Sequence, residues 1–83
     1  MMDLARTPKQ LGNLVRRARK QMGLSQGELS DKAGLRQATI SEIEAGNAGA
    51  KLDSILKVLA TLKLELRIVP RSKGAASDIE DLF

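Results

Sequence analysis

Apolar side chains recur every three or four residues in two stretches, residues 7–22 and 52–62. This pattern predicts an amphipathic helix in each. The first helix should start at Thr7 and Pro8, which suit a helix cap and a first helical position, and run to about Met22. Gly23 suits its end. The side chains expected to be buried are Leu11, Leu14, Val15, Ala18 and Met22 in this helix, and Leu52, Ile55, Leu56, Leu59 and Leu62 in the last one.

Residues 24–46, between these stretches, predict two short helices joined by a tight turn. Ser25 and Glu28 have the spacing of a capping box, in which each side chain accepts a hydrogen bond from the backbone N–H of the other residue. A helix should therefore begin near Gln26. Gly34 then supplies the positive φ that ends a helix and lets the chain turn, so a second helix follows at once.

The polar side of this second helix suits contact with duplex DNA. Ile40 and Ile43 point one way, and small or polar side chains fall on the opposite side. Two short helices that cross steeply can present the second by its N-terminal end to a major groove. The Gln37 amide can donate to and accept from an adenine edge, and the Ala38 methyl can meet a thymine methyl. Any small helical domain also has one polar side, so a purely structural role stays open. The outer positions are Gln37, Ala38, Ser41 and Glu42.

The period of the pattern changes after residue 63. Residues 64–69 alternate apolar and polar side chains and Pro70 follows, which predicts a strand over 64–69. A single strand leaves its edges without hydrogen-bond partners, and the simplest partner is the same strand of a second subunit. Continuation of the preceding helix is the alternative, because Leu and Glu favour helices. The side chains expected to face the cores of such a dimer are Leu64, Leu66 and Ile68.

The composition limits the possible functions. The chain has 83 residues, enough for one small domain, for which association would add stability. It has no cysteine and no histidine, so we expect no disulfide, metal, cofactor or enzyme activity. No apolar run approaches the length of a membrane span or the core of a signal peptide. We therefore expect a soluble protein in the reducing cytoplasm.

Positive charge is concentrated in the N-terminal part of the chain. The formal net charge is +4, and residues 1–36 carry eight basic and three acidic side chains. Such clustering beside a candidate reading helix favours nucleic-acid binding, although a basic surface can also serve solubility alone. Phe83 is the only aromatic residue, so stacking on single strands is not expected and duplex DNA is the better ligand. The basic side chains expected to project outward from the first helix are Arg16, Arg17 and Lys20.

Residues 24–62 resemble the XRE-type, lambda-repressor-like helix-turn-helix family, and the strand that follows makes the chain similar to HipB antitoxins. The resemblance covers residues 11–69. It implies a salt bridge between Arg19 and Glu28. The sequence departs from the family at Gly27, at Glu42 and in the proline-free loop after residue 46. These departures leave undecided which bases the protein reads. The implied base-reading residues are Arg36, Gln37, Ala38 and Ser41, and the implied phosphate contacts are Gln26 and Thr39.

The same resemblance implies an organisation and a function. The fold is expected to be mostly α: an N-terminal arm (1–6), a four-helix DNA-binding domain with its dimerising strand (7–69) and a flexible tail (70–83). The implied function is a dimeric repressor of an inverted-repeat operator, acting as the antitoxin that neutralises a HipA-like kinase. The alternatives are a repressor without a toxin, and a protein-interaction adaptor, which the acidic Glu42 favours.

The last six residues combine acidic and apolar side chains. Some HipB-type antitoxins likewise end in an aromatic residue that docks on the toxin. We therefore expect a toxin-binding tail, with a disordered tail as the alternative. The residues expected to make the contact are Ile79, Leu82 and Phe83.

Overall fold

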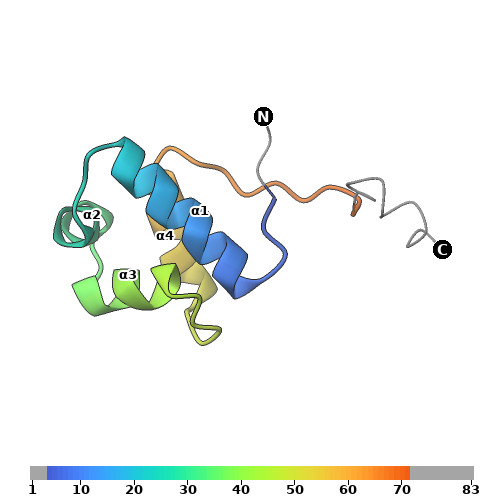
Figure 1. The fold of residues 1–83 in the computed structure, drawn as a ribbon, viewed down its shortest axis with the longest axis horizontal. Coiled ribbons are helices and arrows are strands. Elements are labelled where there is room, and N and C mark those ends of the chain that lie inside the picture. Colours follow the sequence, from blue (N-terminus) through green and yellow to red (C-terminus); the bar gives the residue numbers. More distant parts are fainter. Residues whose placement is uncertain (1–3, 72–83) are drawn as a thin grey trace.

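The computed structural model describes residues 4–71, which form four α-helices (Figure 1). The helices are α1 (Pro8–Gln21), α2 (Gln26–Ala33), α3 (Gln37–Glu44) and α4 (Leu52–Thr61). In Figure 1, α1 lies over α4, α2 is at one end of the molecule and α3 runs below α1. These bounds confirm the helices predicted from the sequence. No helix within residues 4–71 has the length and apolar content needed to cross a membrane.

The predicted helix caps are present. The hydroxyl of Thr7 accepts the backbone N–H of Gln10 at 3.1 Å, and Pro8 follows as the first helical residue. In α2 the Ser25 hydroxyl accepts from the Glu28 N–H at 3.0 Å, while the Glu28 carboxylate accepts from the Ser25 N–H at 2.8 Å. Gly34 ends α2 with φ of +71°, so α3 can start three residues later.

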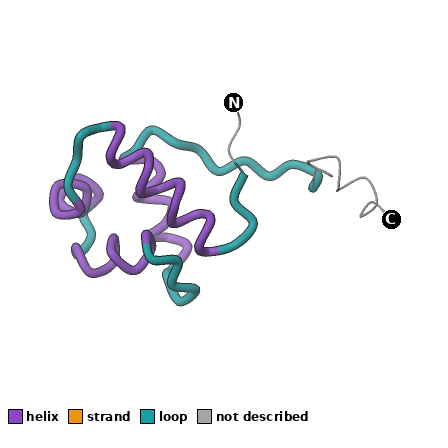
Figure 2. The backbone as a smooth tube through the Cα atoms, in the orientation of Figure 1, coloured by secondary structure: helices purple, strands orange, loops and turns teal. Residues whose placement is uncertain are grey.

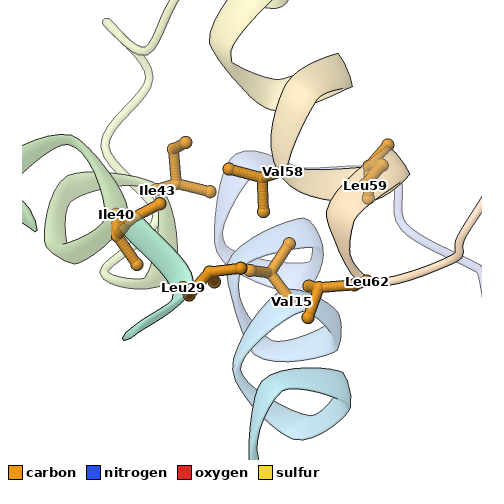
Figure 3. Close-up of a cluster of buried hydrophobic side chains, with 7 residues drawn as sticks. All are labelled: Val15, Leu29, Ile40, Ile43, Val58, Leu59 and Leu62. Atoms are coloured by element: carbon orange, nitrogen blue, oxygen red, sulfur yellow. The ribbon is translucent and has the colours of Figure 1, made fainter. Parts of the chain in front are cut away.

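Seven apolar side chains from all four helices and the end of α4 meet in one core (Figure 3). Each is at most 6% exposed. Because α3 contributes two of them, its inner side is held against α2 and α4 and its outer side is left for other contacts. The core residues are Val15, Leu29, Ile40, Ile43, Val58, Leu59 and Leu62.

Three predicted core positions are wrong. Met22 is 43% exposed as the C-cap of α1, and Leu52 and Leu56 are 62% and 42% exposed. The apolar side of α4 is wider than the core beneath it, and the core takes Val58 instead, which the spacing argument did not select. Leu52 and Leu56 therefore form an apolar surface on the outside of α4.

The N-terminal half of α1 reaches α3 through a glycine that the sequence analysis did not single out. A Cβ at Gly12 would lie 2.5 Å from the carbonyl oxygen of Ile43 and 2.7 Å from that of Glu44. Just beyond α3, Gly46 has φ of +83°, and a Cβ there would lie 2.7 Å from the Cα of Lys9. Backbone therefore packs against backbone where α1 meets the end of α3.

Residues 64–71 leave the helices as a loop (Figure 2). Helix α4 does not continue, because Lys63 adopts φ of +60° and the N–H of Leu64 bonds back to the carbonyl of Leu59 at 2.8 Å. The described residues contain no strand. The strand predicted over 64–69 requires a second chain for its pairing, so it stays a prediction, with Leu64, Leu66 and Ile68 exposed in the single chain.

Candidate nucleic-acid interface

The N-terminal end of α3 carries the predicted base-reading side chains on an open surface. Arg36 occupies the N-cap position of α3, where its guanidinium, which has no acceptor, makes no cap bond. Gln37 and Ala38 follow in the first turn, and all three residues are exposed. Thr39, predicted to contact a phosphate, is half-buried in the same turn. A groove edge could therefore approach this turn without displacing any other element.

Gln37 lies close to the start of α2. A Cβ built on Gly27 would be 3.4 Å from the side-chain oxygen of Gln37, an ordinary van der Waals contact. The side chain of Gln37 therefore extends toward α2, where Gln26 is the first helical residue. The candidate reading residue and a candidate phosphate contact come from neighbouring helix starts.

Ser41 has different surroundings from the first turn of α3. It lines a shallow polar hollow of about 250 Å³ together with Arg16 of α1 and Gln26 of α2. The structure thus brings one predicted base-reading residue together with two predicted phosphate contacts. Arg17 and Lys20 are exposed on α1 but do not line this hollow.

The floor of the hollow is a buried ion pair between α1 and α3. Arg19 donates from Nε to Oε2 of Glu44 at 2.6 Å and from Nη2 to Oε1 at 3.0 Å, and its Nη1 donates to the carbonyl of Leu24 at 2.8 Å. The amide of Gln26 donates to Oε1 of the same carboxylate at 3.1 Å. Arg19 is 8% and Glu44 is 9% exposed. Three helices are therefore joined through one carboxylate.

This pair corrects the expected bridge between Arg19 and Glu28. The carboxylate of Glu28 is used by the capping box of its own helix, where it accepts from Ser25. Arg19 instead meets the last residue of α3, because Gly12, on the same side of α1, lets the end of α3 pack closely against that helix. The pairing partner is Glu44.

The environment of each glutamate changes its pKa. Burial alone raises the pKa of Glu44, but hydrogen bonds from Arg19 and Gln26 and the charges of Arg19 and Arg16 together lower it below its usual value. The hydrogen bonds that Arg19 donates to Glu44 raise the pKa of Arg19 against the effect of burial. The backbone N–H of Ser25, and then its hydroxyl, lower the pKa of Glu28. Both carboxylates are therefore stabilised in the charged form.

Sequence reasoning missed Glu44, although a signal was present. Glu44 follows the buried Ile43 directly and lies one turn after the buried Ile40. An acidic side chain at the edge of an apolar helix side needs a buried partner, since unpaired charges are almost never fully buried. The identity of that partner, 25 residues earlier, depends on the tertiary packing of α1.

The remaining predicted site residues lie partly beyond the described chain. Of the N-terminal arm, Leu4 to Arg6 are described and exposed. Ile79, Leu82 and Phe83, the predicted toxin contacts, lie outside the described residues.

Comparison with known proteins places this geometry in a family. The helix-turn-helix family model matches residues 15–69. The chain is 33% identical over 78 residues to antitoxin HipB of Escherichia coli O6:H1, covering 92% of this chain and 83% of the relative. It is 32% identical over 74 residues to antitoxin HipB of Escherichia coli K12, covering 89% and 84%.

Solved structures agree with these relatives. A chain from the complex of a HipB variant with an O2 20mer superposes with a TM-score of 0.80 at 32% identity, over 87% of this chain and all of that one. A chain of the HipA–HipB–O2–O3 complex gives a TM-score of 0.78 at 32% identity, over 86% of this chain and all of that one. The resemblance read from the sequence is thereby confirmed, and the protein belongs to the helix-turn-helix family and, within it, to the HipB antitoxins.

Proposed function

We propose that this protein is a sequence-specific DNA-binding repressor that serves as the antitoxin of a toxin–antitoxin pair in the cytoplasm. The observation that carries the proposal is the open first turn of α3 beside the polar hollow at α1 and α2. Relatives with the same fold include a HipB chain in a complex with an O2 20mer. The arrangement supplies a reading surface and a phosphate-binding surface on adjacent elements.

The two surfaces have separate tasks. Arg36, Gln37 and Ala38 read base edges, because they are exposed in the first turn of the helix that enters the groove. Phosphates are bound by polar and basic side chains around that helix, which sets the register but carries little sequence information. The proposed phosphate contacts are Gln26, Thr39, Arg16, Arg17 and Lys20.

A duplex titration tests this division. Affinity for DNA from the protein's own promoter should fall steeply with salt, because bound phosphates release counterions. Gln37→Ala should lower the ratio of promoter to random-duplex affinity, a loss of about 1–3 kcal/mol in the difference between the two binding free energies. Gln26→Ala should weaken both duplexes alike. An unchanged ratio in Gln37→Ala at matched salt would show that the reading surface is assigned wrongly.

We propose that the repressor is a two-fold dimer joined by residues 64–69. Leu64, Leu66 and Ile68 are exposed in one chain, and Leu66 also lines an apolar hollow with Leu11 and Ile55. A paired ribbon over the two cores would remove these side chains from water. The operator is then an inverted repeat whose half-sites lie about 34 Å apart or a multiple of that.

The partner proposed for the antitoxin role is a HipA-like kinase. The support is the family and the solved complex of a relative, which contains HipA together with HipB. We assign toxin binding to Ile79, Leu82 and Phe83, the apolar residues of the acidic C-terminal end. Deleting residues 78–83 should weaken kinase binding at least tenfold, about 1.4 kcal/mol, and leave operator binding intact. Calorimetry giving equal affinities for full-length and truncated protein would end this assignment.

One observation favours a second candidate, a protein-interaction adaptor. Glu42 places an exposed negative charge on the polar side of α3, where it would repel phosphates. An adaptor would bind the promoter duplex and random duplex equally weakly at physiological salt. The same titration therefore separates the adaptor from the repressor, and a kinase-like adjacent reading frame separates an antitoxin from a repressor without a toxin.

A further inference from the structure

The buried carboxylate of Glu44 accepts three hydrogen bonds from donors on two helices. Oε2 accepts from Nε of Arg19, and Oε1 accepts from both Nη2 of Arg19 and the amide nitrogen of Gln26. Every buried side-chain nitrogen and oxygen among the described residues has a hydrogen-bond partner. The position of this carboxylate is therefore set from both sides, by α1 and by α2.

This contact determines how the Gln26 amide is turned. A carboxylate only accepts hydrogen bonds, so the NH₂ end of the amide, and not its oxygen, must face Glu44. The Nε2 nitrogen carries two N–H groups, and Glu44 takes one of them at 3.1 Å. The second N–H stays available to an acceptor in the hollow that Gln26 lines.

The hollow lined by Arg19 and Glu44 suits one anionic group. Two positive side chains, Arg16 and Arg19, and one negative side chain, Glu44, line it together with the Ser41 hydroxyl. The net charge of the lining is positive, and Arg16 is close enough to stabilise the charged form of Glu44. An amide N–H, a hydroxyl and a guanidinium are the donors that a phosphate oxygen accepts.

We infer that Glu44 is a positioning residue for DNA binding, which turns the Gln26 amide toward a backbone phosphate seated in the hollow with Arg16 and Ser41. This inference rests on the proposed DNA-binding function and extends it to a residue that touches no DNA. It also moves Ser41 from the reading residues to the phosphate contacts. Ser41→Ala should then weaken all duplexes alike instead of relaxing one base position.

A double-mutant cycle distinguishes positioning from a purely structural ion pair. The variants of the full-length protein are Glu44→Gln, Gln26→Ala and the double variant, each titrated with promoter and random duplex at one salt concentration. Glu44→Gln keeps the shape of the side chain, but its own amide can present either end to Gln26, so the orientation is lost. Thermal melts first establish that each variant is folded at the titration temperature.

We expect Glu44→Gln to weaken both duplexes by about tenfold in the wild-type background. In the Gln26→Ala background, the same substitution should change affinity by less than about twofold, because the group that it positions is gone. An equal fold-loss in both backgrounds would overturn the inference and leave Glu44 as a structural partner of Arg19. If Glu44→Gln does not fold, Glu44→Asp, which keeps the charge but retracts it, goes through the same cycle with the same criteria.

Glu42→Gln is the matched control. It removes one negative charge from the same helix, but Glu42 is exposed and does not line the hollow. Its effect on duplex affinity should be independent of Gln26. If the wild-type protein binds no duplex above the random level, the proposed function fails; if it binds but the cycle shows no coupling, only the positioning role fails.

Discussion

The two sides of this molecule differ in how fully one chain supplies their contacts. On the side where α1, α2 and α3 meet, the buried charges of Arg19 and Glu44 neutralise each other, and the carboxylate of Glu44 also accepts a hydrogen bond from the Gln26 amide. On the side of α4 and residues 64–71, apolar side chains face outward and the extended backbone has no ladder partner within the described residues. We call these the recognition side and the association side.

The difference teaches which property each side depends on. The recognition side is complete within a monomer, so its geometry should depend on pH and packing and very little on protein concentration. We propose that the association side gains its missing contacts from a second molecule, so its state should follow mass action. A perturbation aimed at one side should therefore leave the other largely unchanged, which four substitutions or conditions can test.

The largest expected effect comes from breaking the association side with Leu66→Pro. Proline removes a backbone donor from the proposed ribbon, so the dimer should separate. Operator affinity should fall by about 100-fold or more, because two linked half-site contacts become one. Analytical ultracentrifugation at low micromolar protein concentration measures the mass of the particle in solution, which should be that of a monomer.

Glu65→Ala is the control, because the Glu65 side chain is exposed and forms a surface ion pair with Arg67 at 3.4 Å. A surface pair of this kind contributes little stability. A Leu66→Pro variant that still sediments as a dimer would place the interface elsewhere, with the exposed Leu52 and Leu56 of α4 as the next surface to test.

The next effect breaks the recognition side through packing. Gly12→Ala puts a Cβ within 2.5 Å of the Ile43 carbonyl oxygen, so α1 and α3 must separate slightly. We expect the free energy of unfolding to fall by about 1–3 kcal/mol, or about 4–8 °C in Tm for each kcal/mol. Calorimetry at one fixed protein concentration measures this fall. An unchanged Tm would mean that the close approach is not present in solution.

Acid should loosen the recognition side selectively. The pKa values of Glu44 and Glu28 are lowered in the folded chain, whereas the pKa of a Glu in the unfolded chain is about 4.3. Below about pH 5 the unfolded state binds more protons, so the free energy of unfolding falls as the pH drops toward the folded pKa values. Denaturant titrations between pH 7 and pH 3 measure the slope. Glu44→Gln should flatten it, and an unaltered slope in that variant would remove Glu44 as its source.

The smallest effect should have the opposite sign. Gly27→Ala adds a Cβ that meets the Gln37 side chain only at 3.4 Å, an ordinary contact. Alanine favours a helix over glycine by about 1 kcal/mol, so Tm should rise by a few degrees while the dimer is unaffected. Measured beside Gly12→Ala, it shows that the penalty at residue 12 comes from contact and not from loss of glycine as such. A fall in Tm would mean that the start of α2 cannot accept a side chain.

Local features of the chain were predictable because their causes lie within a few residues. Thr7 and Pro8, the Ser25–Glu28 box and Gly34 act through backbone groups next to them, so the helix bounds followed from the sequence. The polar outer side of α3 also followed, since helical spacing alone places Ala38 and Ser41 on the side away from Ile40 and Ile43.

The features that escaped prediction depend on which helices approach each other. The partner of Arg19 depends on which helix packs against its side of α1, and the close contact at Gly12 brings the end of α3 there. Leu52 and Leu56 were predicted to be in the core because periodicity alone cannot distinguish a buried apolar side chain from an exposed one on the same side of a helix. The strand predicted over 64–69 stays a prediction, because its pairing needs a second chain.

The backbone contact between α1 and the end of α3 divides the reading helix into two parts with different freedom to change during evolution or engineering. Substitutions at 36–38 alter side chains on an open surface and can exchange one sequence preference for another. The last turn, from Ile43 to Gly46, is pressed against Gly12 and Lys9, where an added carbon atom on either glycine meets backbone. A designer who wishes to retarget this protein should therefore replace the first turn of α3 and transplant nothing beyond residue 42.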